Sequence, residues 1–282
     1  MTATDVLLDG LAFPEGPRWH EGRFWFSDMH AHEVVAVDLD GRREVIAEVP
    51  QQPSGLGWLP DGRLLVVSMT DRRLLRREAD GTFATHADLS ALASWWCNDM
   101  VVDGEGRAWV GNFGFDLFAE QPAPRFGEII RVDPDGTATV VCADARFPNG
   151  SVVTPDGGTL IVGESTGRRL RAFTIEADGS LRGDRIWADL GDNVPDGICL
   201  DAEGAVWSAD PRNGVALRVA EGGEILDRVD TGRGCYACML GGEDRRTLLL
   251  CTAEDSDPAV CRATRSGRLE TVTVDVPGAG WP

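Results

Sequence analysis

The stretch FPNGSVVTPDGGTLIVGES, residues 147–165, contains the pattern from which the fold can be predicted. A short apolar run, a Pro-Asp-Gly-Gly turn signal and a second apolar run indicate a β-hairpin. Four related phrases occur elsewhere, with a different polar residue at the position of Asn149: FPEGPRWHEGRFWFSD (13–28), QPSGLGWLPDGRLLVVS (52–68), WCNDMVVDGEGRAWVGN (96–112) and VPDGICLDAEGAVWSAD (194–210). The chain is therefore built from repeated units.

Alignment of these phrases gives the period of the repeat. At spacings of 39, 44, 51, 47 and 40 residues, the varied position holds Glu15, Ser54, Asn98, Asn149, Asp196 and, in the least similar unit, Tyr236. Each unit continues with a third apolar run and a shorter fourth one. Four antiparallel strands repeated at this period predict an all-β, six-bladed β-propeller in which residues 1–282 form a single domain. Helix signals are nearly absent, apart from one turn at DLSALAS (88–94).

The two ends of the chain are predicted to share the last blade. A propeller that did not close would leave two sheet edges open to aggregation. The N-terminal run DVLLDGLAF (5–13) is well placed to pair with LETVTVDV (269–276). We therefore expect the first strand of the chain to complete the sixth blade.

The composition is that of a globular protein with a strongly acidic surface. The 282 residues carry a net charge of −19, which disfavours nucleic acid and anionic membranes as partners. No apolar run is long enough to span a membrane, and no export signal is visible, so we expect a cytoplasmic monomer or small homo-oligomer. The odd number of cysteines, seven, favours reduced thiols. Cys235 and Cys238 form a C-x-x-C that we interpret as two buried core residues, the alternatives being a redox pair or half of a zinc site.

The repeat geometry predicts a metal site in the central channel. The first strand of each propeller blade lines the channel, so the varied positions form a ring, and oxygen-bearing side chains from four blades converge there: Glu15, Asn98, Asn149 and Asp196. Such oxygen ligands suit a hard divalent cation, with Ca²⁺ favoured over Mg²⁺ and Mn²⁺, and with Zn²⁺ and Fe²⁺ as alternatives. The ends of the second strands should form an outer ring that walls the pocket or supports the ligands: Asp28, Ser68, Asn112, Glu164, Asp210 and Thr252. His30 and His32, in a turn at the edge of this face, are further candidate ligands or bases, although turn histidines are usually solvated.

The quoted motifs, FPEGPRW, WCNDMVVDGEG, FPNGSVVTPDG and VPDGICLDAEG, together resemble the regucalcin (senescence-marker-protein), gluconolactonase and luciferin-regenerating-enzyme family of six-bladed propellers. The resemblance covers essentially the whole chain. It implies a divalent metal held by Glu15, Asn149 and Asp196, with Asn98 at longer range or through water, and it places Asp99 beside the substrate. Members commonly hydrolyse lactones, and relatives with the same cage hydrolyse organophosphates.

One departure from the family pattern bears on the substrate. Sugar-lactone hydrolases of the family carry an Arg two residues before the position of Asn98, and here that residue is Trp96. An aromatic ring cannot donate the paired hydrogen bonds of a guanidinium, so we expect a less hydroxylated, more apolar lactone or ester. The insertion at 113–127 is a candidate lid, and its Arg125 is a candidate replacement for the missing Arg. The predicted substrate-binding residues are Trp96, Asn98, Asn112, Phe113, Arg125 and Tyr236.

The predicted mechanism is metal-assisted hydrolysis. A divalent ion polarises a lactone carbonyl and acidifies a bound water, and a nearby carboxylate accepts the proton. Asp196 is the candidate base and Asp99 the reserve. The sequence has no phosphate-binding glycine loop. Phosphotriester hydrolysis, addition or isomerisation on the same cage, and a non-enzymatic propeller that binds metal or a small ligand, are the alternatives.

Overall fold

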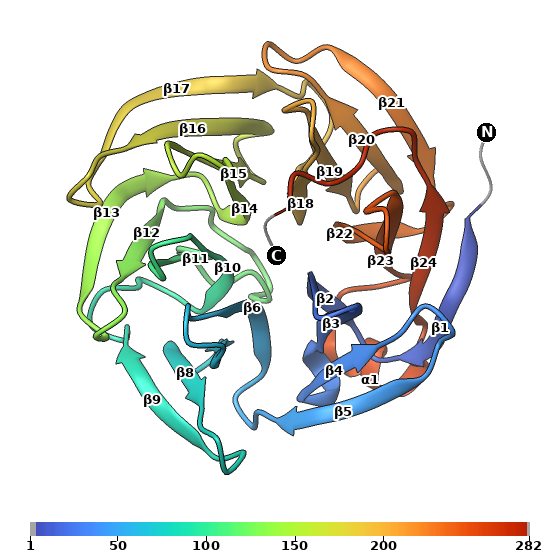
Figure 1. The fold of residues 1–282 in the computed structure, drawn as a ribbon, viewed down its shortest axis with the longest axis horizontal. Coiled ribbons are helices and arrows are strands. Elements are labelled where there is room, and N and C mark those ends of the chain that lie inside the picture. Colours follow the sequence, from blue (N-terminus) through green and yellow to red (C-terminus); the bar gives the residue numbers. More distant parts are fainter. Residues whose placement is uncertain (1–3, 281–282) are drawn as a thin grey trace.

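The repeats fold into six four-stranded antiparallel sheets arranged around a central channel (Figure 1). The structure is a computed structural model and describes residues 4–280. In the first five blades the strands follow chain order from the channel outward, and in the sixth the order is β22-β23-β24-β1. The predicted six-bladed propeller is confirmed.

The first three blades contain twelve strands. Blade 1 consists of β2 (Pro14–His20), β3 (Arg23–Asp28), β4 (Glu33–Val37) and β5 (Arg43–Glu48). Blade 2 consists of β6 (Pro53–Trp58), β7 (Leu64–Ser68), β8 (Arg73–Arg77) and β9 (Phe83–Asp88). Blade 3 consists of β10 (Cys97–Val102), β11 (Ala108–Asn112), β12 (Gly127–Val132) and β13 (Ala138–Ala145).

The other three blades include the two chain ends. Blade 4 consists of β14 (Pro148–Val153), β15 (Thr159–Glu164), β16 (Arg169–Ile175) and β17 (Leu181–Asp189). Blade 5 consists of β18 (Ile198–Leu200), β19 (Val206–Asp210), β20 (Val215–Val219) and β21 (Ile225–Asp230). Blade 6 consists of β22 (Gly234–Gly241), β23 (Thr247–Ala253), β24 (Gly267–Thr273) and β1 (Asp5–Leu11).

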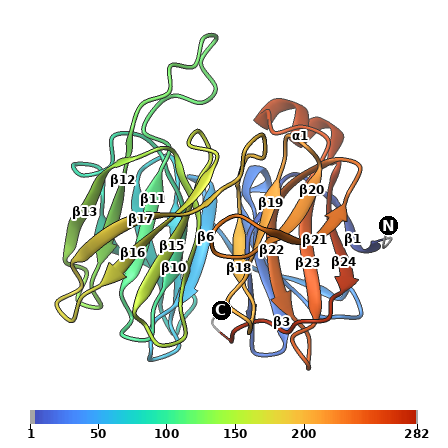
Figure 2. The ribbon, with the colours of Figure 1, turned by 90° about the horizontal axis from the view of Figure 1, so that it is seen from above.

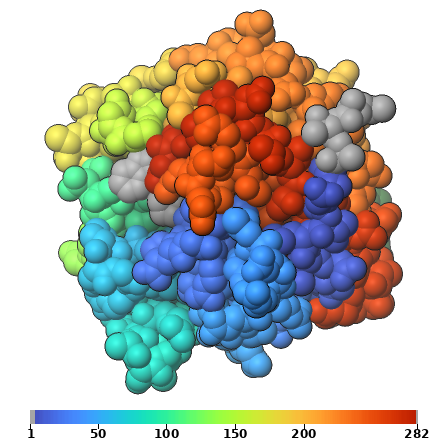
Figure 3. Space-filling view, turned by 45° about the vertical axis from the view of Figure 1, so that its right-hand side comes forward, coloured from blue at the N-terminus to red at the C-terminus, as the bar shows by residue number. Residues whose placement is uncertain are grey.

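The N-terminal strand closes the ring, as the sequence predicts. In the register of β1 with β24, Val6 lies opposite Glu270 and Leu11 opposite Gly267. Leu11 is fully buried in the core that β22 and β23 also enter. The blue N-terminal and red C-terminal parts of the chain lie against each other on the surface (Figure 3). Pairing of β1 with β24 therefore leaves no open edge between the last blade and the first.

The glycine after the varied residue explains why the phrase recurs. Neighbouring innermost strands approach so closely that a Cβ on Gly150 would collide with the backbone nitrogen of Ile198. A Cβ on Gly55 would likewise collide with the backbone nitrogen of Met100. The repeat therefore keeps a glycine for packing, while the residue before it is free to vary.

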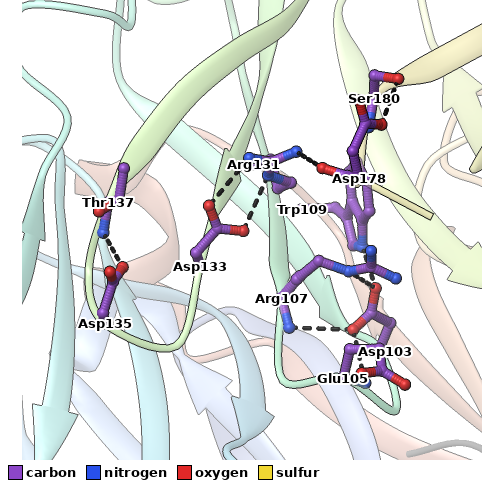
Figure 4. Close-up of polar contacts among 10 residues, drawn as sticks. All are labelled: Asp103, Glu105, Arg107, Trp109, Arg131, Asp133, Asp135, Thr137, Asp178 and Ser180. Atoms are coloured by element: carbon purple, nitrogen blue, oxygen red, sulfur yellow. Dashed lines mark hydrogen bonds and ion pairs between the residues drawn. The ribbon is translucent and has the colours of Figure 1, made fainter. Parts of the chain in front are cut away.

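Many of the acidic residues belong to turns on the face opposite the insertion. In blade 3, Asp103 accepts from the backbone nitrogens of Glu105 and Arg107, both at 3.0 Å, and from Trp109 Nε1 at 3.1 Å (Figure 4). Asp178 of blade 4 similarly accepts from the backbone nitrogen of Ser180 at 2.9 Å. Such turns satisfy backbone groups through a short carboxylate side chain. Much of the negative charge is therefore explained by turn chemistry alone.

The helical content differs from the prediction in its position. DLSALAS forms turns after β9, whereas the only α-helix within residues 4–280 is α1 (Pro258–Thr264). It begins where Asp257 accepts hydrogen bonds from two backbone nitrogens of the first turn, with Pro258 in the favoured first position. A 3₁₀ turn, η1 (Met29–Ala31), lies beside it. In the described part of the chain, no helix has the length and apolar character needed to cross a membrane.

All seven cysteines lie within the described residues, and all are buried and free. Cys235 and Cys238 lie on the innermost strand β22, as the interpretation of C-x-x-C as a core pair predicts. The closest pair of sulfur atoms recorded joins Cys238 to Cys199 of β18, at 3.9 Å.

Candidate functional site

One face of the propeller carries α1 and the protruding insertion (Figure 2). A pocket of about 200 Å³ opens on this face. Oxygen-bearing residues from blades 1, 3, 4 and 5 line it: Glu15, Asn98, Asn149, Ser165 and Asp196. Most of its remaining wall is apolar and includes Phe13, Met29, Phe113, Leu117, Phe118 and Phe147. The four residues predicted as metal ligands are therefore brought together at the base of an aromatic pocket.

Hydrogen bonds between blades fix the two asparagines. Asn98 Nδ2 donates to Asn149 Oδ1 at 3.0 Å, and Ser54 Oγ donates to Asn98 Oδ1 at 3.3 Å. Asn98 therefore directs its nitrogen toward the ring and its oxygen toward Ser54. This arrangement suits the prediction that Asn98 acts on the metal at longer range or through water. It also shows that Ser54 orients the side chain of Asn98.

Ser165 is a site residue that the sequence reasoning missed. Its hydroxyl donates to the carbonyl of Pro195 at 2.7 Å and accepts from Asn149 Nδ2 at 3.2 Å. It thereby connects Asn149 to the segment that leads into Asp196. The sequence feature that could have identified Ser165 is its position in the repeat, directly after Glu164 at the end of β15.

Glu15 and Asp196 are carboxylates without cationic partners. Burial, followed by repulsion from Asp196, raises the pKa of Glu15 well above its usual value. Burial, followed by repulsion from Asp99, raises the pKa of Asp196 in the same direction. Across residues 4–280, neither forms an ion pair with Arg or His. Two desolvated acids that repel each other are the environment that a bound cation would stabilise.

The donor set fits a hard divalent cation. Within the described chain no three His, Cys, Asp or Glu side chains gather as a metal cluster, so a site here must take part of its ligands from asparagine. Glu15, Asn149 and Asp196 together supply carboxylate and amide oxygens, the ligands that Ca²⁺ prefers.

The outer ring supports the pocket rather than lining it. Asp28 accepts from the backbone nitrogens of Ala12 and Phe13 at 3.1 and 2.7 Å, just before Glu15. Asp210 accepts from the backbone nitrogen of Val194 at 3.1 Å, just before Asp196. These buried carboxylates hold the loops that enter the ring.

Asp99 lies close to the ring but is not among the residues that line the pocket. Its Oδ1 accepts from Arg18 at 3.0 Å and from the backbone nitrogen of Met100 at 2.8 Å. Burial raises the pKa of Asp99, and Arg18 acts in the opposite direction. Both side chains of the pair are nearly inaccessible.

Three predicted substrate residues also lie outside the pocket lining. Trp96 packs against Phe118, with ring centroids 6.1 Å apart, and so contacts a lining residue without lining the pocket itself. Asn112 is fully buried and binds both ends of the insertion: it accepts from the backbone nitrogen of Gly114 and donates to Glu128. Arg125 is exposed in a separate groove beside Arg146.

Phe113 and Tyr236 do line the pocket, together with His30. His30 is 2% exposed, so the expectation of a solvated turn histidine is wrong for this residue. Its Nε2 lies 3.3 Å from the carbonyl of Ser256, and burial lowers its pKa to about 4. Burial raises the pKa of Tyr236, which keeps its hydroxyl protonated at neutral pH.

Comparisons with known proteins agree with this geometry. A family model described as the SMP-30/gluconolactonase/LRE-like region matches residues 13–254. The chain is 29% identical over 294 residues to the 6-deoxy-6-sulfogluconolactonase of Pseudomonas putida, which covers 98% of this chain and 96% of the relative. It is 28% identical over 268 residues to pentonolactonase XacC of Haloferax volcanii, which covers 90% and 86%.

A solved structure shares the whole fold. It is that of a calcium-binding protein, regucalcin, from Agrobacterium tumefaciens, with a TM-score of 0.83, 28% identity and coverage of 100% of this chain and 97% of that one. The resemblance inferred from the motifs is confirmed, and the chain belongs to the SMP-30/gluconolactonase/LRE-like family.

Proposed function

We propose that the protein is a metal-dependent lactone hydrolase. The observation that carries the proposal is the convergence of Glu15, Asn149 and Asp196 at the base of one largely apolar pocket. Relatives that match nearly the whole chain are named as lactonases, and the regucalcin neighbour is named as calcium-binding. A divalent ion such as Ca²⁺ would be held by these three residues, with Asn98 acting through Asn149 or a water.

The cage carboxylates supply the acid and base chemistry. When bound, a divalent cation would act as a Lewis acid for the substrate carbonyl and favour deprotonation of a water. Asp196 is our candidate for the base that accepts the water proton, since its carboxylate lines the pocket. Asp99, engaged by Arg18, is the weaker candidate.

The pocket wall favours an apolar substrate. Phe113, Phe118 and Phe147 offer no hydrogen bonds to hydroxyl groups, and no Arg lines the pocket within the described residues. We therefore propose a lactone or ester that is less hydroxylated than gluconolactone. Leu117 and Phe118 bring the insertion into the pocket wall, which supports the proposal that residues 113–127 act as a lid.

The test is hydrolysis by metal-stripped protein, with each divalent ion added back in turn, on a sugar lactone and on an aliphatic or aromatic lactone of equal ring size. We expect activity to return with metal and to favour the apolar lactone. Preference for the sugar lactone would contradict the substrate assignment alone. Metal binding without turnover of either lactone would contradict the hydrolase proposal and favour phosphotriester or other chemistry, tested next, or a binding role.

A further inference from the structure

Two residues of the channel depart from the repeat, each in one blade only. The position after the varied residue is a glycine or alanine in five blades, Gly16, Gly55, Gly150, Gly197 and Ala237, but blade 3 has Asp99. Two positions further along, five blades have a small or apolar residue, Gly57, Val101, Val152, Cys199 and Met239, but blade 1 has Arg18. Each exception places a charge where the other blades have none.

The two exceptions meet inside the channel. Arg18 comes from β2 and Asp99 from β10, which are separated in the ring by β6 of blade 2. Gly55 of blade 2 lies directly against the backbone of Asp99, where a Cβ would come within 3.0 Å of the Asp99 Cα. Arg18 donates to Asp99 Oδ1 at 3.0 Å and also to the carbonyls of Pro17 and Met100. The side chains are 5% and 7% exposed, so this is a buried ion pair built by two complementary substitutions.

The pair separates two unlike halves of the channel. Below it lies a small space of about 30 Å³, lined by Val101, Val152, Cys199 and Met239 and bordered by Arg245 and the C-terminal segment at Gly278. Arg18 lines this space, and its Nε is buried without a hydrogen-bond partner. Above the pair, the charge of Asp99 acts on both Glu15 and Asp196. An unpaired charge would be costly in this setting.

We propose that Arg18 is a positioning residue that holds Asp99 beneath the metal cage and sets the charge of the site to suit one divalent cation. Glu15, Asp99 and Asp196 provide three carboxylates, and Arg18 is the one guanidinium among them. The site therefore has two negative charges in excess, which a divalent ion neutralises. Asp99, held by Arg18 through Oδ1, does not line the pocket, which leaves Asp196 for the role of base. The inference rests on the metal site of the proposed function.

Metal titration of the metal-free protein tests this without any substrate. We would measure Ca²⁺ and La³⁺ affinities by calorimetry for the parent, Asp99→Asn, Arg18→Met and the double variant. Asp99→Asn leaves Arg18 unopposed and should weaken Ca²⁺ binding at least about tenfold. Arg18→Met adds one excess negative charge and should shift the La³⁺ to Ca²⁺ preference toward La³⁺ by about tenfold or more. The double variant restores the charge balance and should bind Ca²⁺ within about threefold of the parent.

Arg107→Met is the matched control. It breaks a partly buried ion pair with Asp103, 2.7 Å long, at the turn that follows the same strand β10 (Figure 4). It should lower the melting temperature without changing either metal affinity. If Arg18→Met does not fold, Asp99→Asn and the double variant still decide the matter.

Four outcomes overturn the inference: a parent that binds no divalent ion, single variants that bind like the parent, a double variant no closer to the parent than Asp99→Asn, or a control that shifts affinity equally. Failure of the proposed function looks different. A parent that shows the expected affinity shifts but hydrolyses no lactone would leave the role of Arg18 intact.

Discussion

The central channel has an upper and a lower ring of side chains, which lie three residues apart on the same innermost strands. The two rings differ in chemistry. The upper ring places Glu15, Asn149 and Asp196 around a pocket open to solvent. The lower ring is apolar apart from Arg18, and the segment at Gly278 covers it through a 2.9 Å hydrogen bond to the carbonyl of Arg245. The lower half follows the rules of core packing, whereas the upper half keeps repelling acids that a bound cation would stabilise.

The largest effect should come from opening the ring itself, because both halves depend on six strands closing around one axis. Deletion of residues 1–10 removes most of β1 and exposes the edge of β24. We expect the melting temperature to fall by at least about 10 °C. Differential scanning calorimetry measures it, and a truncated protein that melts like the parent would contradict closure by β1.

Neutralising the upper ring should abolish function without loss of stability. Asp196→Asn and Glu15→Gln keep the side-chain shape but remove a charge that the cage needs, so we expect turnover of the preferred lactone to fall about a thousandfold or more. Because burial and repulsion from neighbouring carboxylates raise the pKa of both acids, the metal-free variants should melt no lower than the parent.

Asp99→Asn is the comparison variant for this series, and we expect a smaller loss of turnover for it. Near-parental turnover by Asp196→Asn with metal bound would show that Asp196 is not the base. A large fall in melting temperature in Glu15→Gln would show that its carboxylate is part of the packing.

The repeat explains how much of this comparison was predictable. Six repeated phrases, four of them with a glycine after the varied residue, were enough to predict the blade count, the inner strands and the ring of Glu15, Asn98, Asn149 and Asp196. Propeller geometry converts a repeat position into a place at the channel. The closure of the last blade followed from the same reasoning, since a ring cannot leave an edge unpaired.

Features outside the repeat were harder to predict from the sequence. Ser165 touches the ring only because β15 returns to it, and helix α1 depends on the local cap at Asp257. The substitution of Trp96 pointed to an apolar pocket, yet Trp96 itself lies behind Phe118 rather than in the lining. The sequence pattern predicts which position of the repeat a residue occupies. The direction of a side chain near a loop depends instead on packing partners far along the chain.

A polar group should be tolerated far less in the lower half. Val152 lies three residues after Asn149 on β14 and packs in the core with Ile198. Val152→Asp buries a charge with no partner, and we expect the free energy of unfolding to fall by about 3 kcal/mol or more. Val152→Thr, which keeps the shape and adds only a hydroxyl, should cost about 1 to 2 kcal/mol. Equal urea-denaturation midpoints for both variants would contradict the view that charge, not shape, separates the two halves.

The smallest effect is a difference in the pH dependence of stability. The folded pKa of Glu15 is raised above its unfolded value, so the folded state holds this proton more tightly than the unfolded state does. Stability that the protonated acid contributes is therefore lost as pH rises from the unfolded pKa through the folded one. Relative to Glu15→Gln, the metal-free parent should melt at progressively lower temperature as pH increases across this window, and His30 titrates alike in both proteins. Thermal melts from pH 5 to pH 9 measure the difference in melting temperature between the two proteins. Parallel curves would mean that the carboxylate of Glu15 is not destabilised in the folded protein, and that the upper ring is as favourably packed as the lower one.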